Sequence, residues 1–225
     1  MTALSSGRRA TVVALLVVAV VAVVVRGDGT DGTPGSATNS AANAMAEGDA
    51  VVSDVHGPLC DALPAGDDPG GPQAIAGLDA AVALSWIPVL TIFGAGTRAS
   101  GLSAELAAAD GVTILAPSDD AFLLALTQET LDELIISRQD ELRELLETHI
   151  VDDALTVRDL VAAGSVTTRS GDTLTVVAAG DEARLGDRAT TVCSDYRVAN
   201  ATIHVIDGVL GELPAPAEQG QPVSG

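Results

Sequence analysis

Residues 198–210 read VANATIHVIDGVL and form the longest uninterrupted β-type run outside the N-terminal region. Apolar side chains occupy both odd and even positions of this run, so they point to both faces of the predicted strand. These side chains are Ile203, Val205, Ile206, Val209 and Leu210. The run therefore predicts a strand at the centre of a sheet that is covered on both sides.

A second run, residues 112–122, reads VTILAPSDDAF. It predicts a strand over 112–116, a turn at Ala116-Pro117, and a short helix that Ser118 caps and that carries Phe122, Leu123 and Leu126 inward. Strands and helices in one chain indicate a mixed α and β fold.

These two runs resemble the two sequence signatures of fasciclin domains, and the resemblance extends over about residues 73–214. It implies an α+β fold in which a bent two-sheet β core has several helices packed along one side. The signature positions, which we expect to be structural, are Thr113, Ala116, Pro117, Phe122, His149, Asn200, Val205, Ile206 and Asp207.

A third match lies at Thr148-His149-Ile150, where the family usually has Tyr-His-Val. The Tyr-His pair has been linked to integrin binding in animal members, and Thr148 replaces that Tyr here. We therefore interpret His149 as a packed histidine at a helix end.

Cys60 and Cys193 are the only cysteines, and an even count in an exported chain indicates a disulfide, with two buried thiols as the alternative. The segments Gly57-Pro58-Leu59-Cys60 and Thr191-Val192-Cys193 are also similar to the secreted or surface fasciclin-domain antigens of mycobacteria. That resemblance implies the same bridge.

The N-terminus carries Arg8 and Arg9 before sixteen uncharged apolar residues, 10–25. This arrangement is typical of a signal peptide, but no Ala-x-Ala site follows closely, which favours an uncleaved membrane anchor with the remainder outside. The chain is predicted to comprise an anchor or signal peptide (1–26), a flexible linker (27–53), a lead-in with Cys60 (54–72), a fasciclin-like domain (73–214) and a disordered tail (215–225).

The composition is acidic and poor in aromatic residues: the net charge is −20, all 11 cationic residues are Arg, and aromatics make up 2%. A negative surface repels phosphate backbones, so we expect no nucleic-acid partner. The lack of Lys beside abundant Ala, Gly and Arg favours a GC-rich genome such as that of an actinobacterium.

Several local signals predict individual elements. Thr130 and Glu133 have capping-box spacing for a helix start, and Ser103 is placed to cap an earlier helix. Residues 165–169 and 173–177 predict a hairpin. Asn200 and Thr113 are expected to hold the final strand against the turn near Pro117 through buried hydrogen bonds.

No catalytic motif occurs, and His56, His149 and His204 have no ligand spacing. The pairs Asp119-Asp120 and Asp152-Asp153 are open to an acid–base interpretation, but capping at helix starts explains them better. We predict no catalytic residue, cofactor or metal site. The sequence does not locate a ligand-binding surface.

The predicted function is therefore non-enzymatic adhesion or ligand binding outside the membrane, with an extracellular protein, glycan or lipid as partner. The alternative is a structural protein that maintains the cell envelope without a specific ligand. An electrostatic interaction would require a basic partner, and its affinity would fall with salt.

Overall fold

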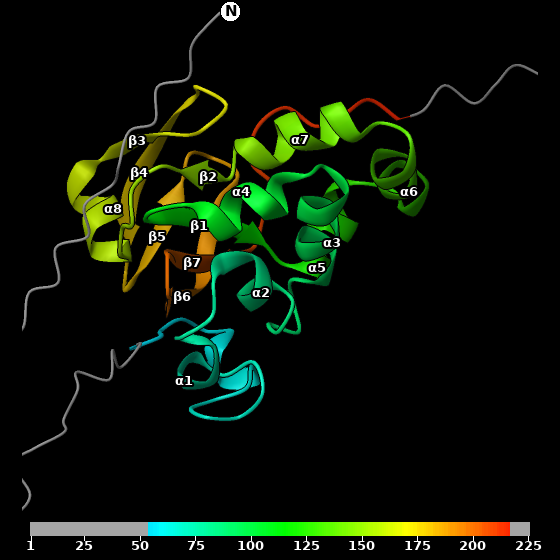
Figure 1. Ribbon diagram of the computed structural model, residues 1–225. Helices are drawn as coiled ribbons and strands as arrows, with labels where there is room; N and C mark the ends of the chain where they lie inside the picture. The colour runs from blue at the N-terminus through cyan, green and yellow to red at the C-terminus, as the bar shows by residue number, and fades with distance from the viewer. Residues whose placement is uncertain (1–53, 217–225) are drawn as a thin grey trace, which may run out of the picture. The chain divides into compact units, whose positions relative to one another are not determined.

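A computed structural model of the chain describes residues 54–216 (Figure 1). The predicted anchor and linker and most of the predicted tail lie outside the described residues. The helices are η1 (Cys60–Ala62), α1 (Pro72–Ile75), α2 (Ala80–Leu84), α3 (Thr91–Ala99), α4 (Leu102–Ala108), α5 (Asp119–Ala125), α6 (Gln128–Ile136), α7 (Gln139–Glu147) and α8 (Val157–Ala163). The strands are β1 (Val112–Pro117), β2 (Ile150–Val151), β3 (Ser165–Thr167), β4 (Thr173–Ala179), β5 (Glu182–Leu185), β6 (Ala189–Val198) and β7 (Ala201–Ile206).

The seven strands form one mixed sheet in the order β2-β1-β7-β6-β5-β4-β3. Strands β1 and β7 are parallel, and the other neighbouring pairs are antiparallel. Just after β3, the Arg169 N–H donates to the Ile150 carbonyl of β2 at 2.7 Å, so the sheet is nearly closed.

The α+β class is confirmed, but the two-sheet core implied by the resemblance is replaced by this single sheet. The reason lies in β6, whose pairing with β7 shifts register between Thr191 and Cys193 and again between Cys193 and Tyr196. Bulges of this kind bend a strand and increase its twist, so the sheet curls without splitting.

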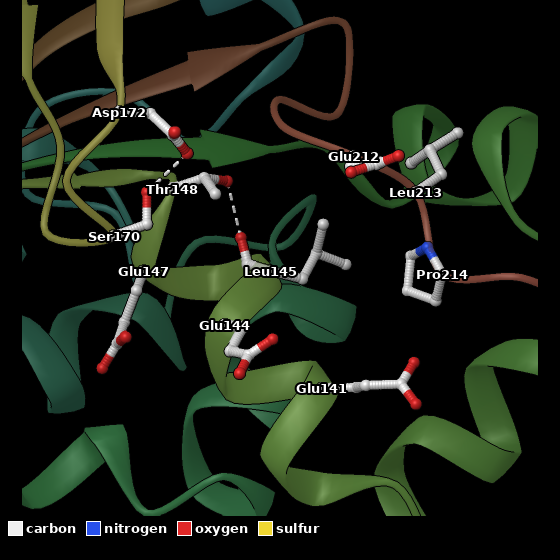
Figure 2. Close-up of a pocket in the computed structure, with 10 residues that line it drawn as sticks. All are labelled: Glu141, Glu144, Leu145, Glu147, Thr148, Ser170, Asp172, Glu212, Leu213 and Pro214. Carbon is white, nitrogen blue, oxygen red and sulfur yellow. Dashed lines mark hydrogen bonds between the residues drawn. The ribbon is translucent and has the colours of Figure 1, made fainter.

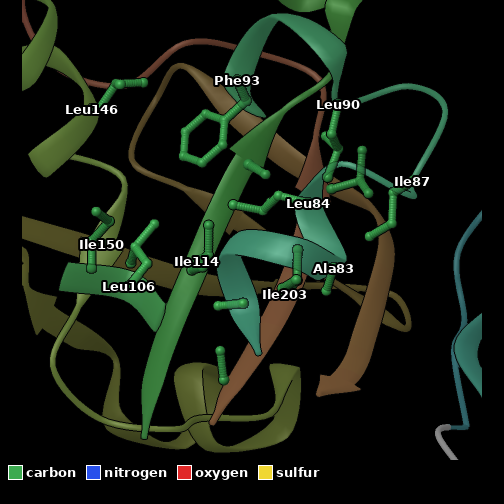
Figure 3. Close-up of a cluster of buried hydrophobic side chains, with 14 of the residues drawn as sticks. Ala83, Leu84, Ile87, Leu90, Phe93, Leu106, Ile114, Leu146, Ile150 and Ile203 are labelled. Carbon is green, nitrogen blue, oxygen red and sulfur yellow. The ribbon is translucent and has the colours of Figure 1, made fainter. Parts of the chain in front are cut away.

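The central strands β1 and β7 are buried at every position, which confirms the two-sided burial predicted for the final strand. Ile203, Val205 and Val209 belong to the larger apolar cluster, part of which Figure 3 shows. Ile206 and Leu210 belong to a smaller cluster on the other face. The run is not one strand, however, because β6 ends at Val198 and a turn precedes β7.

The helices divide between the two clusters. Helices α1 to α7 contribute buried side chains to the larger cluster, whereas α8 contributes Val157 and Leu160 to the smaller one and contacts β3, β4 and β5. The expectation of helices along one side therefore fails for α8.

Two of the three predicted helix starts differ from the structure. The Ser118 hydroxyl accepts from the Ala121 N–H at 3.2 Å and caps α5 as predicted. Helix α6 starts earlier than predicted, because Thr127 caps it and Thr130 is a buried residue inside it. Helix α4 follows Gly101, whose φ of +79° suits glycine, and Ser103 does not cap it.

The predicted hairpin is confirmed, since β3 and β4 pair antiparallel across residues 168–172. The helix preceding it, α8, is fixed by a capping box in which the Thr156 and Asp159 side chains each bond to the other's backbone N–H.

The Cys60–Cys193 disulfide is confirmed, with a Cα to Cα distance of 5.0 Å. It ties the lead-in, residues 54–72, to β6 across a sequence separation of 133 residues. The Leu59 N–H donates to the Val192 carbonyl at 2.8 Å. At Gly57, φ is +126° and an added Cβ would lie 2.5 Å from the Val192 oxygen, so only glycine allows this close approach.

Candidate functional site

The signature residues lie in the core and at the ends of the central strands. Ala116 and Phe122 are buried, and Pro117 ends β1. The Thr113 hydroxyl donates to the Asp153 carbonyl at 2.6 Å and accepts from the Leu155 N–H at 2.8 Å. This pair of bonds fastens the segment before α8 to β1.

Asn200 lies in the turn between β6 and β7 and is fully engaged by the backbone. Its Oδ1 accepts from the Ala80 N–H at 2.9 Å, and its Nδ2 donates to the Leu106 and Ala109 carbonyls at 2.8 and 3.1 Å. The predicted contacts of Thr113 and Asn200 with the Pro117 turn are therefore wrong. Asn200 joins its turn to α2 and α4.

The signature's last three residues divide between core and surface. Val205 and Ile206 are buried in opposite clusters. Asp207 is exposed, and its Oδ1 accepts from the Thr190 N–H at 2.7 Å.

The carboxylate pairs do not form acid–base pairs. Asp119 and Asp120 lie in the first turn of α5, as predicted, and Asp119 also binds the start of α3, since its Oδ1 accepts from the Ile92 N–H at 2.8 Å and its Oδ2 from the Thr91 hydroxyl at 2.6 Å. Asp152 and Asp153 follow β2 and start no helix, so the capping interpretation is wrong for this pair, and Asp152 instead pairs with Arg169 at the surface. Within residues 54–216, no group of three or more His, Cys, Asp or Glu is placed to hold a metal ion.

His149 is a buried, neutral histidine. Its Nδ1–H donates to the Leu145 carbonyl at 2.8 Å, and its Nε2 accepts from the Leu210 N–H at 2.9 Å. Complete burial lowers its pKa to about 4, because the charged ring would be desolvated. His149 therefore attaches the segment after β7 to the end of α7.

An acidic groove of about 600 Å³ opens beside this attachment (Figure 2). Helix α7 forms its floor, the β3–β4 hairpin lies on one side, and the segment after β7 lies on the other. We define the acidic groove by its lining residues: Glu141, Glu144, Leu145, Glu147, Thr148, Ser170, Asp172, Glu212, Leu213 and Pro214.

The carboxylates of the acidic groove are only partly neutralised. Glu141 pairs with Arg138, and Glu147 pairs with Arg143 at 2.9 Å. Among the groove's carboxylates, Glu144, Asp172 and Glu212 take part in no ion pair with the described residues, although Asp172 accepts a hydrogen bond from the Ser170 hydroxyl. The groove therefore presents uncompensated negative charge next to apolar side chains.

A second group, around Asp195, was missed by sequence reasoning. Asp195 Oδ2 lies 3.8 Å from His56 Nδ1, and Oδ1 lies 3.6 Å from His204 Nδ1. Asp195 is the one non-glycine residue among those described with a positive φ, +64°. The sequence feature that could have predicted this group is the cysteine pairing, because a bridge from Cys60 to Cys193 brings His56 close to Asp195.

This group is held by backbone bonds. The Asp195 N–H donates to His204 Nδ1 at 3.2 Å, and His204 Nε2–H donates to the Leu155 carbonyl at 3.0 Å. Burial lowers the pKa of His204, and the nearby Asp195 opposes this effect only in part. His204 is thus a neutral structural residue that holds the β6 bulge and the segment before α8.

Comparison with known proteins decides the family. The fasciclin-domain family model matches residues 88–212. The chain belongs to the fasciclin family. The immunogenic protein MPB70 of Mycobacterium bovis is 32% identical over 169 residues, which cover 72% of this chain and 84% of that protein. This relative confirms the predicted likeness to mycobacterial antigens.

Two further matches cover about half of this chain. The transforming growth factor-beta-induced protein ig-h3 of Sus scrofa is 35% identical over 116 residues, which are 52% of this chain but 17% of that protein. A FAS1 domain pair from the insect cell adhesion molecule fasciclin I aligns with a TM-score of 0.42 and 22% identity, covering 53% of this chain and 44% of that one.

Proposed function

We propose that this fasciclin domain acts outside the cytoplasm as a non-enzymatic binding module that uses the acidic groove to hold a basic segment of a protein partner. The single observation that carries the proposal is the presence of two carboxylates in no ion pair, Glu144 on α7 and Glu212 on the segment after β7, in a groove that is also lined by Leu145 and Leu213. Adhesion at the cell surface is the role that such binding would serve.

The disulfide supports a location outside the cytoplasm, because disulfides persist in oxidising compartments and are rare in reducing ones. The predicted anchor, residues 10–25, would keep the domain at the membrane surface. Within residues 54–216, no helix has the length and apolar character needed to cross a bilayer.

The charge of the domain supports a basic partner. Residues 54–216 contain 26 Asp and Glu against 8 Arg. Such a field attracts cationic groups and repels nucleic acids and anionic lipids. A groove with apolar side chains among its carboxylates suits Lys or Arg on a peptide better than a glycan.

Binding of a basic peptide tests the proposal. The polar probe is a fluorescent peptide with a central Ser-Ser flanked on both sides by Lys, and affinity is measured by anisotropy. The double variant Glu144→Gln/Glu212→Gln should weaken binding about tenfold, since each exposed charge pair contributes up to about 1 kcal/mol. Raising the salt concentration should also lower the affinity of the unmodified chain for the polar probe.

The matched control is Glu129→Gln/Asp132→Asn, which removes the same charge from the exposed face of α6 outside the groove. An equal loss of affinity in both double variants would mean that binding of the polar probe depends only on the net charge of the domain. No measurable binding at low salt would favour the structural role in the envelope.

A further inference from the structure

Helix α5 carries two leucines that are not buried in the core. Its inward face buries Ala121 and Phe122, whereas Leu123, which the sequence wrongly predicts to point inward, is 50% exposed and Leu124 is 86% exposed. Leu124 is the most exposed of the large apolar side chains among the described residues.

Leu124 borders a small cleft of about 350 Å³. We define the apolar cleft by its lining residues: Pro58, Leu59, Ser118, Asp120, Ala121, Leu124, Val192 and Asp207. The lead-in supplies one wall, and both the disulfide and the Leu59 N–H bond to Val192 hold it there. The apolar cleft shares no lining residue with the acidic groove.

We propose that the apolar cleft is a second docking site, which takes an aliphatic side chain of a partner protein flanked by Lys or Arg. The apolar walls would bury the aliphatic group, and burying one such side chain favours binding strongly enough to anchor a short segment.

The charges at the rim select this occupant. Asp120 and Asp207 border the apolar cleft, and neither is in an ion pair among the described residues. Asp207 uses only Oδ1 for the Thr190 N–H, so Oδ2 is available to a cation. A basic flank on the partner complements these carboxylates.

The same charges disfavour the other occupants. A second copy of this acidic domain would bring carboxylates against carboxylates, and so would the chain's own linker, which has four acids and no Lys or Arg in residues 27–53. An anionic lipid surface would be repelled in the same way.

The test compares two peptides on the full chain. The leucine probe is the polar probe with its central Ser-Ser replaced by Leu-Leu, and the ratio of the two dissociation constants isolates the apolar contribution. We expect about a tenfold preference for the leucine probe. Leu124→Ser should reduce this preference to about one, while Leu123→Ser, the matched control outside the apolar cleft, should leave it unchanged.

Three outcomes would overturn the proposal. One is equal binding of the two probes, and another is an equal loss of preference in both leucine variants. The third is that Leu124→Ser abolishes self-association in sedimentation, or binding to phosphatidylcholine vesicles, which would assign the apolar cleft to a second copy or to a lipid surface. Circular dichroism of each variant confirms folding, which exposed substitutions should not disturb.

Discussion

The acidic groove and the apolar cleft lie on one domain, but different bonds hold their walls. One wall of the acidic groove is the segment after β7, which the neutral ring of His149 attaches to α7. One wall of the apolar cleft is the lead-in, which the Cys60–Cys193 disulfide attaches to β6. One fold thus presents two surfaces of different chemistry, and each surface has its own support.

Loss of the disulfide should have the largest effect. The double variant Cys60→Ser/Cys193→Ser frees a long loop in the unfolded chain, which costs up to about 5 kcal/mol of folding free energy in the chain-entropy model. Denaturant unfolding measures the loss. A change below about 1 kcal/mol would show that the cross-link contributes little to the stability of the domain.

Acid should destabilise the protein through His149. The ring has a pKa of 6.5 when unfolded and about 4 when folded, so its contribution is complete above pH 6.5 and is lost as pH falls towards 4. The predicted loss is about 3 kcal/mol from this group. Urea unfolding across this pH range measures it.

His149→Phe provides the control for this pH dependence. The variant keeps an aromatic ring beside Phe93 but cannot titrate, so its stability should fall less between pH 6.5 and 4. Some dependence of stability on pH should remain, because burial also lowers the pKa of His204. An unchanged slope in the variant would assign the acid sensitivity to other groups.

Asn200 lines neither the acidic groove nor the apolar cleft. Asn200→Ala leaves the Ala80 N–H and the Leu106 carbonyl without their partner, which costs about 2 kcal/mol. Asn200→Asp keeps an acceptor for the Ala80 N–H but sets a carboxylate oxygen against the Leu106 and Ala109 carbonyls, so it should cost at least as much. Both variants should lower stability in thermal unfolding and leave the preference between the two probes unchanged.

Patterns local in sequence predicted the fold well. The two-sided apolar run placed Ile203 and Ile206 in opposite clusters, because side-chain direction in a strand depends only on position. Bonds between distant segments were not predictable in this way. Asn200 bonds to Ala80, 120 residues away, and nothing in the spacing identifies that partner.

The acidic groove was not recognised in the sequence for the same reason. Glu144 belongs to a charged helix face that reads as solvated, and only folding brings Asp172 and Glu212 from two other segments to its side. The apolar cleft likewise depends on the disulfide, which was predicted, and on the exposure of Leu124, which no local pattern distinguishes from burial.

The most direct test of two independently supported surfaces is to titrate the polar probe and the leucine probe against the unmodified chain, His149→Phe and Cys60→Ser/Cys193→Ser at neutral pH. Loosening the acidic groove in His149→Phe should weaken the polar probe and leave the leucine probe, which the apolar cleft binds, nearly unchanged, so the preference for the leucine probe should rise. Loss of the disulfide should abolish that preference while the polar probe binds as before. If both variants instead weaken both probes and change the preference to the same extent, the two surfaces are not independently supported.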